Sequence, residues 1–159
     1  MKTSTLLLVM LLMGTFLYGQ GKSPKFKQDE VKILSVLEKY IIANETQNID
    51  LIEEIWAIDE PILAFGTEVG EKIEGWEELR SVYLRQFNNF TETYISARDQ
   101  KININDTGNS AWFSQILNYN FTLEGISRKY EGIRFTGVLI KKGEQWRLVQ
   151  IHLSLPYDM

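Results

Sequence analysis

The only histidine of the 159-residue chain lies near its C-terminus, and a single titratable group of this kind invites a catalytic role. His152 alternates with Ile151 and Leu153, so it shares the other face of its strand with polar neighbours. We therefore expect His152 to hydrogen-bond across a subunit interface, with catalysis as the alternative. Neither a metal site nor a cofactor is expected, because one His and no Cys offer no usual ligand spacing.

Arg134 is the strongest polar anchor in the sequence for an anionic or carbonyl-bearing ligand. It stands in an otherwise apolar segment, and a guanidinium inside a pocket needs a partner, either Glu71 or a ligand carboxylate. An interface arginine paired with a surface carboxylate is the alternative. We expect an apolar pocket with Arg134 as its principal charge and Glu71 near its mouth.

Aromatic side chains are the remaining candidates for ligand contact. Trp56, Tyr83 and Trp112 could line a pocket, although aromatic residues at helical or strand spacing are usually part of a core. Glu68 and Glu71 are the carboxylates best placed to act as a base, and an exposed loop is the simpler account of both.

The periodicity of the first half of the chain predicts helices that would position these residues. Apolar residues recur there at intervals of three and four, as on a helix with one buried face. The expected elements are a helix over 29–44 with Asp29 as N-cap, a short helix over 50–56 with Asp50 as N-cap, a strand within 62–67, and a helix that follows Gly75.

The second half changes to a period of two. Apolar side chains occupy odd positions from 111 to 123, as in a strand with one buried face. In the preceding strand, 92–105, the parity slips, and we expect a bulge near Asp99 and Gln100. Strands over 133–140 and 146–155, joined by a turn at 142–144, complete an antiparallel sheet. The pattern predicts an α+β domain with helices on one face.

Several sequence features together resemble one family. They are Phe65-Gly66-Thr67, Glu71 and Gly75 before the third helix, the segment 134–139, and the W-x-x-x-Q-x-H-x-S-x-P pattern that starts at Trp146. This combination, spanning 31–156, resembles SnoaL-like members of the nuclear transport factor 2 (NTF2) superfamily. The resemblance implies a cone: three N-terminal helices packed on a curved antiparallel sheet, enclosing a pocket and often dimerising through the outer face of the sheet.

That superfamily includes ketosteroid isomerases, polyketide cyclases, dehydratases and purely associating domains, so fold does not settle function. The isomerases place a carboxylate base where this chain has Gly66 and Thr67, which disfavours their mechanism. Two hypotheses remain: a non-catalytic module that binds a small apolar or anionic ligand and self-associates as a homodimer, or a cofactor-independent enzyme (a cyclase, isomerase or dehydratase) acting on an apolar carbonyl compound. A pocket carboxylate beside Arg134 or a tyrosine would favour the enzyme.

The chain begins with the pattern of a signal peptide, over 1–19. Lys2 precedes an apolar run that is too short for a membrane span, and a linker over 20–30 separates it from the domain. The net charge of −4, or −5 without Lys2, opposes binding to nucleic acid and to anionic lipid. We expect a periplasmic or secreted protein with no membrane contact after cleavage.

Cleavage after Gly19, or one residue later, is the first testable prediction. Mass spectrometry of the protein recovered from culture fractions should find Gln20 or Gly21 at the N-terminus. A cytoplasmic protein that retains Met1 would contradict export.

Overall fold

The structure, a computed structural model, describes residues 26–156. The predicted signal peptide and residues 20–25 of the predicted linker lie outside this range, and the rest of that linker overlaps the first helix. None of the helices in the described range is long and apolar enough to cross a membrane. The elements are α1 (Lys27–Glu45), α2 (Ile49–Ile55), β1 (Leu63–Phe65), β2 (Lys72–Glu74), α3 (Trp76–Asn89), β3 (Phe90–Ile104), β4 (Ser110–Leu123), β5 (Ile126–Lys142) and β6 (Gln145–Ser154).

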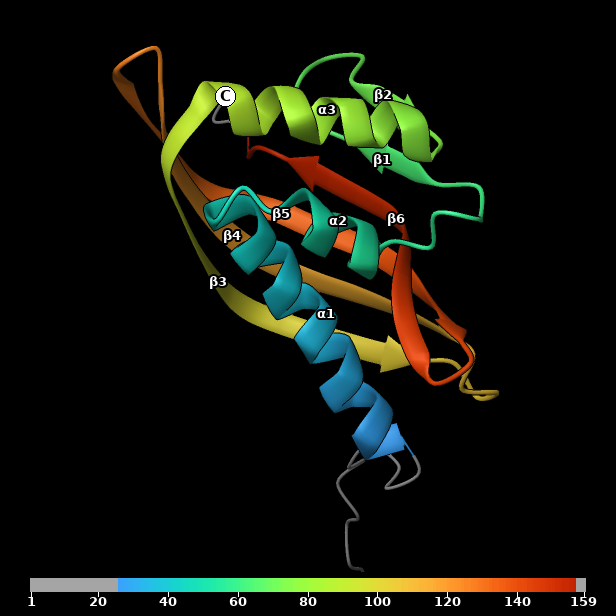
Figure 1. The fold of residues 1–159 in the computed structure, drawn as a ribbon. Helices are drawn as coiled ribbons and strands as arrows, with labels where there is room; N and C mark the ends of the chain where they lie inside the picture. The colour runs from blue at the N-terminus through green and yellow to red at the C-terminus, as the bar shows by residue number, and fades with distance from the viewer. Residues whose placement is uncertain (1–25, 157–159) are drawn as a thin grey trace, which may run out of the picture.

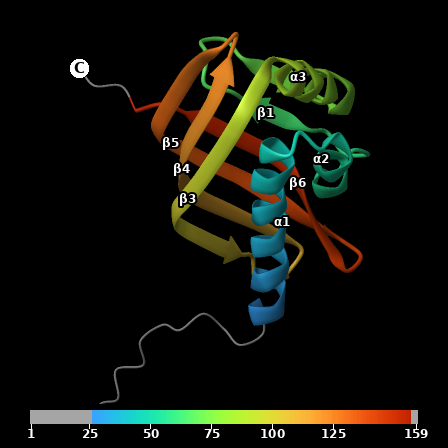
Figure 2. The ribbon, with the colours of Figure 1, turned by 60° about the vertical axis from the view of Figure 1, so that its left-hand side comes forward.

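All six strands form one sheet in the order β2-β1-β6-β5-β4-β3. The three helices cover one face of this curved sheet and leave the other face bare (Figures 1 and 2). The expectation of a purely antiparallel sheet is wrong, because β1 runs parallel to β6. The short strands β1 and β2 also separate α2 from α3. Only β1 was predicted, as a strand within 62–67; the Lys-Ile-Glu sequence of β2 has a single apolar residue and gave no signal of a strand.

The start of α1 differs from the prediction. Asp29 lies inside the first turn, so it is not the N-cap. Its carboxylate accepts a hydrogen bond from the Trp146 indole N–H (2.9 Å) and pairs with Lys141 (2.8 Å). Asp29 therefore ties the start of α1 to the β5–β6 hairpin, a long-range contact that local sequence rules do not reveal.

The other two helices follow from local sequence. In α2 the cap is Asn48, whose side chain accepts a hydrogen bond from the Leu51 N–H (3.0 Å), so the predicted cap at Asp50 is two residues too late. The third helix begins directly after Gly75, as predicted. Gly75 has a φ of +84°, which a residue with a side chain rarely adopts.

The strand predictions are confirmed in their main features. In β4 the odd-numbered side chains from Ala111 to Phe121 face the helices and are buried, as the alternation predicted. The register of β3 against β4 shifts between Arg98 and Lys101, which confirms the bulge near Asp99 and Gln100. A second shift, between Thr91 and Tyr94, was not predicted. Bulges bend a strand and increase its twist, so these two contribute to the curvature around the helices.

A further register shift decides which side chains of β6 face inward. Leu139 pairs with Leu148 but Val138 pairs with Gln150, so Val149 is the extra residue of a bulge. The buried set therefore changes from even to odd numbers along β6, and Val149 does not belong to the apolar face that was expected to run from 149 to 155.

We expect Asp29→Asn to lower the free energy of unfolding by about 1 kcal/mol at pH 7, because it removes the ion pair with Lys141 while keeping an acceptor for Trp146. Hydrogen bonds from Lys141 and Trp146 lower the pKa of the Asp29 carboxyl below its ordinary value. A lowered folded-state pKa contributes stability above about pH 4 that is lost at lower pH.

Denaturant unfolding between pH 7 and pH 2.5 measures this effect, with Glu38→Gln on the exposed side of α1 as the control. The difference between the parent and Asp29→Asn should shrink as the pH falls below about 4. A difference that stays constant over the whole range would contradict the assigned role of the Asp29 charge.

Candidate functional site

A cavity of about 470 Å³ lies between α3, the loop that joins β1 to β2, and the concave face of the sheet. Aromatic and aliphatic side chains make up most of its wall. The aromatic residues are Tyr40, Phe65, Tyr83, Phe90, Tyr119, Phe121 and Tyr130. A cavity of this size and composition is suited to one small, mainly apolar molecule.

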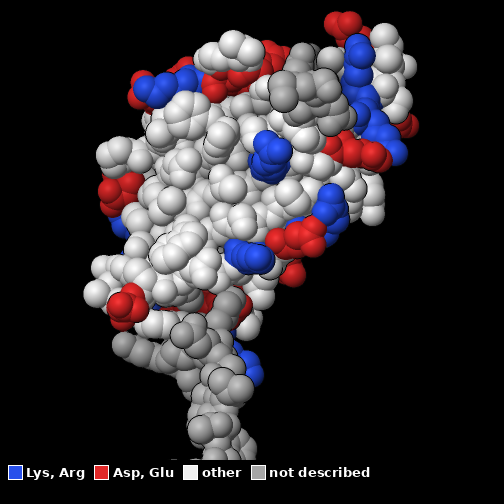
Figure 3. Space-filling view, turned by 180° about the vertical axis from the view of Figure 1, so that it is seen from behind, with Lys and Arg blue, Asp and Glu red and all other residues white. Residues whose placement is uncertain are grey.

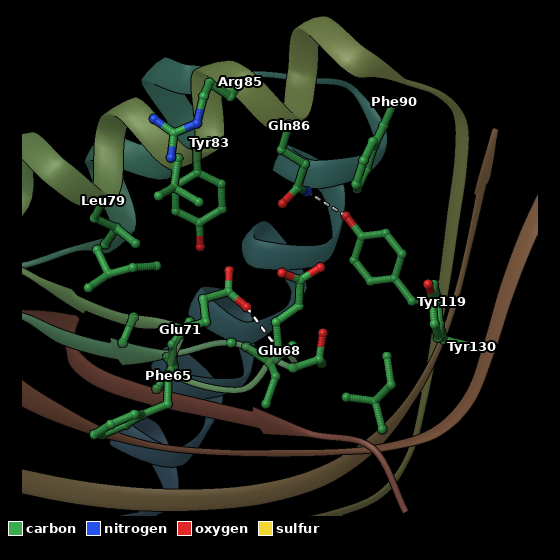
Figure 4. A pocket seen from close by; sticks show the side chains of 18 of the residues that line it. Phe65, Glu68, Glu71, Leu79, Tyr83, Arg85, Gln86, Phe90, Tyr119 and Tyr130 are labelled. Carbon is green, nitrogen blue, oxygen red and sulfur yellow. Dashed lines mark hydrogen bonds between the residues drawn. The ribbon is translucent and has the colours of Figure 1, made fainter. Parts of the chain in front are cut away.

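Helix α3 supplies one wall because its apolar stripe faces the sheet. Leu79, Val82, Tyr83 and Gln86 recur at intervals of three and four and all line the cavity. Three of the four are apolar or aromatic, and Gln86 is the exception. Figure 4 shows Tyr83 and Gln86 directed from the helix toward the centre of the cavity.

The loop from Gly66 to Glu71 brings two carboxylates to the opposite wall. The Glu71 side chain folds back over Gly66, and a Cβ on Gly66 would lie only 1.8 Å from Glu71 Oε2. The loop is closed by a hydrogen bond from Gly66 N–H to the Glu71 carbonyl (3.1 Å) and by one from Glu68 N–H to Glu71 Oε2 (3.3 Å). Both carboxylates, those of Glu68 and Glu71, point into the cavity toward Tyr83 and Gln86 (Figure 4).

The three buried phenols of the cavity, those of Tyr40, Tyr83 and Tyr119, are un-ionised at physiological pH. Tyr40, Tyr83 and Tyr119 are each less than 10% exposed. Burial raises the pKa of each of these phenols above its usual value, and for Tyr83 the neighbouring Tyr40 raises it further. The wall therefore presents carboxylates on one side and un-ionised hydroxyl groups on the other.

A buried hydrogen-bond network fixes the orientation of Gln86. The Asn44 amide N–H donates to the Tyr40 carbonyl (2.7 Å), so Asn44 Oδ1 is left to accept from Gln86 Nε2 (2.9 Å). Gln86 Nε2 also donates to the Tyr119 hydroxyl (2.7 Å), which in turn donates to Asn44 Oδ1 (3.3 Å). With its nitrogen committed in this way, Gln86 turns its carbonyl oxygen toward the cavity (Figure 4).

A stack of three rings lines the part of the cavity nearest the β4–β5 hairpin. Phe90 lies nearly parallel to Phe121 with 3.9 Å between centroids, and Tyr130 stacks on Phe121 at 5.8 Å. Tyr130 is 37% exposed. The stack therefore runs from the apolar interior to the surface.

The structure separates the sequence-predicted site residues into three groups. Glu71 and Tyr83 line the cavity. Trp56 is fully buried in the core and is not among the lining residues.

Arg134, Trp112 and His152 lie on the opposite, outer face of the sheet. Arg134 pairs with Ile116 and Ser154 and is exposed, so the expectation that it is the principal charge of the pocket is wrong. The reason is parity: Ile133 and Phe135 form the more apolar set of β5 and face the helices. Trp112 is 51% exposed, which rules out its expected contact with this cavity.

His152 is exposed on the outer face, as its alternation with Ile151 and Leu153 predicted. It packs edge-on against Phe65, with 5.7 Å between ring centroids. Figure 3 shows that much of this face of the molecule is uncharged, with basic side chains scattered over it and acidic side chains next to some of them.

Tyr40, Gln86 and Tyr119 are functional candidates that the sequence did not single out. Tyr40 and Tyr119 follow apolar periods and look like ordinary core residues. The signal for Gln86 is its polar side chain three residues after Tyr83, on the apolar stripe of α3.

Comparisons with known proteins place this fold in a family. No curated protein matches the sequence significantly. Among solved structures, a proposed dehydratase of the NTF2-like family from Streptomyces avermitilis has a TM-score of 0.74 at 14% identity, covering 82% of this chain and 99% of its own. A proposed scytalone dehydratase from Novosphingobium aromaticivorans has a TM-score of 0.72 at 10% identity, covering 82% and 85%.

An NTF2-like protein of unknown function from Pseudomonas putida KT2440 has a TM-score of 0.69 at 19% identity and covers 83% of this chain and 89% of its own. At these identities the three likenesses show the fold alone. A comparison with sequence families matches residues 33–158 to the SnoaL-like domain, which is most of the chain. The protein belongs to the SnoaL-like family and has the NTF2-like α+β fold.

Proposed function

We propose that the protein binds one small, mainly apolar molecule in the cavity, with the polar end of that molecule at Glu71, Tyr83 and Gln86. The observation that carries this proposal is the contrast within the wall: apolar and aromatic side chains make up most of it, while the polar groups converge between α3 and the Gly66–Glu71 loop. A few convergent polar groups in an apolar cavity are typical of ligand sites.

The position of Glu71 favours a second candidate function, cofactor-independent proton transfer. A carboxylate beside a tyrosine inside the cavity is the arrangement that would distinguish an enzyme from a passive binder. Glu71 supplies a proton acceptor and Tyr83 a neutral donor that can stabilise a developing oxyanion on a carbonyl group. Two structures with this fold come from proteins described as proposed dehydratases, which makes this class of reaction a reasonable one to test.

Proton abstraction next to a carbonyl group can be measured without the natural substrate. The protein should accelerate hydrogen–deuterium exchange at the carbon adjacent to the carbonyl of 2-indanone in D₂O, followed by NMR. Glu71→Gln should slow the catalysed exchange about 100-fold or more, because it removes the base. Glu74→Gln is the matched control, since Glu74 pairs with Lys72 on β2 and does not line the cavity.

Exchange that is no faster than in buffer, or that is equal in the parent and Glu71→Gln, would reject the enzyme. Binding without exchange would leave the protein as a ligand-binding module.

Gly66→Ala tests whether the position of the Glu71 carboxylate matters. The new Cβ would occupy the place of Glu71 Oε2, so the carboxylate must move. Because that contact is with the far end of a flexible side chain, the free energy of unfolding should change by less than about 1 kcal/mol. Exchange should nevertheless fall toward the Glu71→Gln level. A variant with parental exchange and parental stability would show that this placement is unimportant.

We also propose that the protein is a homodimer through the outer face of the sheet. The row formed by Ser114, Thr136 and His152 crosses the middle of this face, with Trp112 and Ile116 on either side of Ser114 along β4. Half-exposed aromatic and aliphatic groups among hydrogen-bonding side chains are typical of the central part of an interface. The chain has no cysteine, so a dimer outside the cytoplasm would be held by this packed face and not by a disulfide.

Light scattering on a size-exclusion column tests the dimer. The parent should elute with twice the chain mass, and Thr136→Arg should elute as a folded monomer, because two added guanidinium groups would meet near the two-fold axis. A parent that is monomeric at high micromolar concentration would reject the proposed interface.

A further inference from the structure

We propose that the ligand of the cavity carries a protonated amine, which is held by Glu68, Glu71 and the carbonyl oxygen of Gln86. This inference rests on the proposed binding function and names the chemical class of the ligand. It concerns what the cavity binds and is independent of whether the bound molecule reacts.

The inference is based on the hydrogen-bonding groups at the polar end of the cavity, where acceptors outnumber donors. Glu71 Oε1, the Glu68 carboxylate and Gln86 Oε1 all face the cavity, and none of them accepts a hydrogen bond from residues 26–156. All three groups are acceptors. Facing them, the Tyr83 hydroxyl already interacts with Tyr40 and Trp56, so it supplies at most one donor. A ligand that complements this end must therefore supply several donors, and an ammonium group supplies up to three.

Buried residues of the protein hold the Gln86 amide so that its carbonyl oxygen faces the cavity. If Gln86 were reversed, its carbonyl oxygen would face Asn44 Oδ1, which is itself an acceptor because the Asn44 nitrogen donates to the Tyr40 carbonyl. Asn44 is only 1% exposed, so water does not relieve such a conflict. Packing and hydrogen bonding therefore fix Gln86 Oε1 at the cavity wall, so the amide cannot rotate freely to present its nitrogen instead.

The two carboxylates at the polar end disfavour the anionic ligand that the sequence suggested. Glu68 and Glu71 form no ion pair with a lysine or arginine in the described part of the chain. Arg85 is the one basic residue among those that line the cavity; it is exposed to solvent, and Figure 4 shows its guanidinium above the Tyr83 ring, next to α3. A carboxylate at the polar end would meet two like charges, whereas a cation would neutralise one or both.

The aromatic wall adds to the preference for a cation. Tyr83 and Tyr119 lie on either side of the polar end, with the carboxylates of Glu68 and Glu71 between their rings in the view of Figure 4. The faces of such rings attract an ammonium group within about 6 Å of the centroid. Carboxylates combined with aromatic rings thus favour an amine over a neutral alcohol of the same shape.

Calorimetric titration with two sets of isosteres tests the proposal. The sets are 2-phenylethylamine, 2-phenylethanol and 3-phenylpropanoate, and n-hexylamine, n-hexanol and heptanoate, at pH 7 and low salt. In at least one set the amine should bind about tenfold more tightly than the alcohol, and the carboxylate should not bind measurably. Glu71→Gln and Glu68→Gln should each weaken amine binding and change alcohol binding less than twofold. Glu74→Gln should change neither.

The possible outcomes distinguish a failure of the amine proposal from a failure of the proposed ligand-binding function. If an alcohol or a carboxylate binds as tightly as its amine, the ligand class is wrong while a ligand-binding cavity remains. If the amine preference survives in both Glu71→Gln and Glu68→Gln, the amine is bound elsewhere and the assignment fails. If no compound of either set binds, both the amine and the proposed cavity function are rejected.

Discussion

Asn44 is the polar side chain on which the inner end of the cavity depends. Its amide nitrogen is bound to the backbone of its own helix, and its oxygen accepts from Gln86 on α3 and from Tyr119 on β4. One buried residue thus joins two helices and the sheet. Its loss would leave Gln86 and Tyr119 without their shared acceptor, at a cost of about 1–3 kcal/mol for each unsatisfied buried group. It would also release the Gln86 carbonyl from its fixed orientation.

The remainder of the site depends on the curvature of the sheet and on the lack of a side chain at Gly66. The two bulges of β3 and the bulge at Val149 in β6 bend the sheet around the helices, so that the α3 stripe faces a concave wall. At the opposite wall, Gly66 leaves room for the Glu71 carboxylate. The cavity therefore combines a constrained amide from the interior with a carboxylate held by a short loop.

The periods in the sequence were sufficient to predict much of the fold and little of the site. The alternation of β4, the bulge at Asp99 and Gln100, and the helix after Gly75 all follow from local patterns, and the C-terminal motif led to the correct family. Placing Arg134 was harder, because the choice of inward face depends on the whole of β5. Asp29 looked like a helix cap, yet it binds residues more than 100 positions away. The polar side chain of Gln86 on the apolar stripe of α3 was its one local signal, and nothing in the sequence indicated the orientation that Asn44 gives it.

Solved structures with the same fold belong to proteins described with different functions or with none, so the function of this chain has to be found in its cavity. The most direct measurement is a crystal structure of the protein grown with 2-phenylethylamine. We expect electron density for the probe between α3 and the Gly66–Glu71 loop, with its nitrogen within about 3 Å of a Glu68 or Glu71 oxygen and of Gln86 Oε1. A cavity filled by its own side chains, or a probe seen only on the outer face of the sheet, would contradict the account.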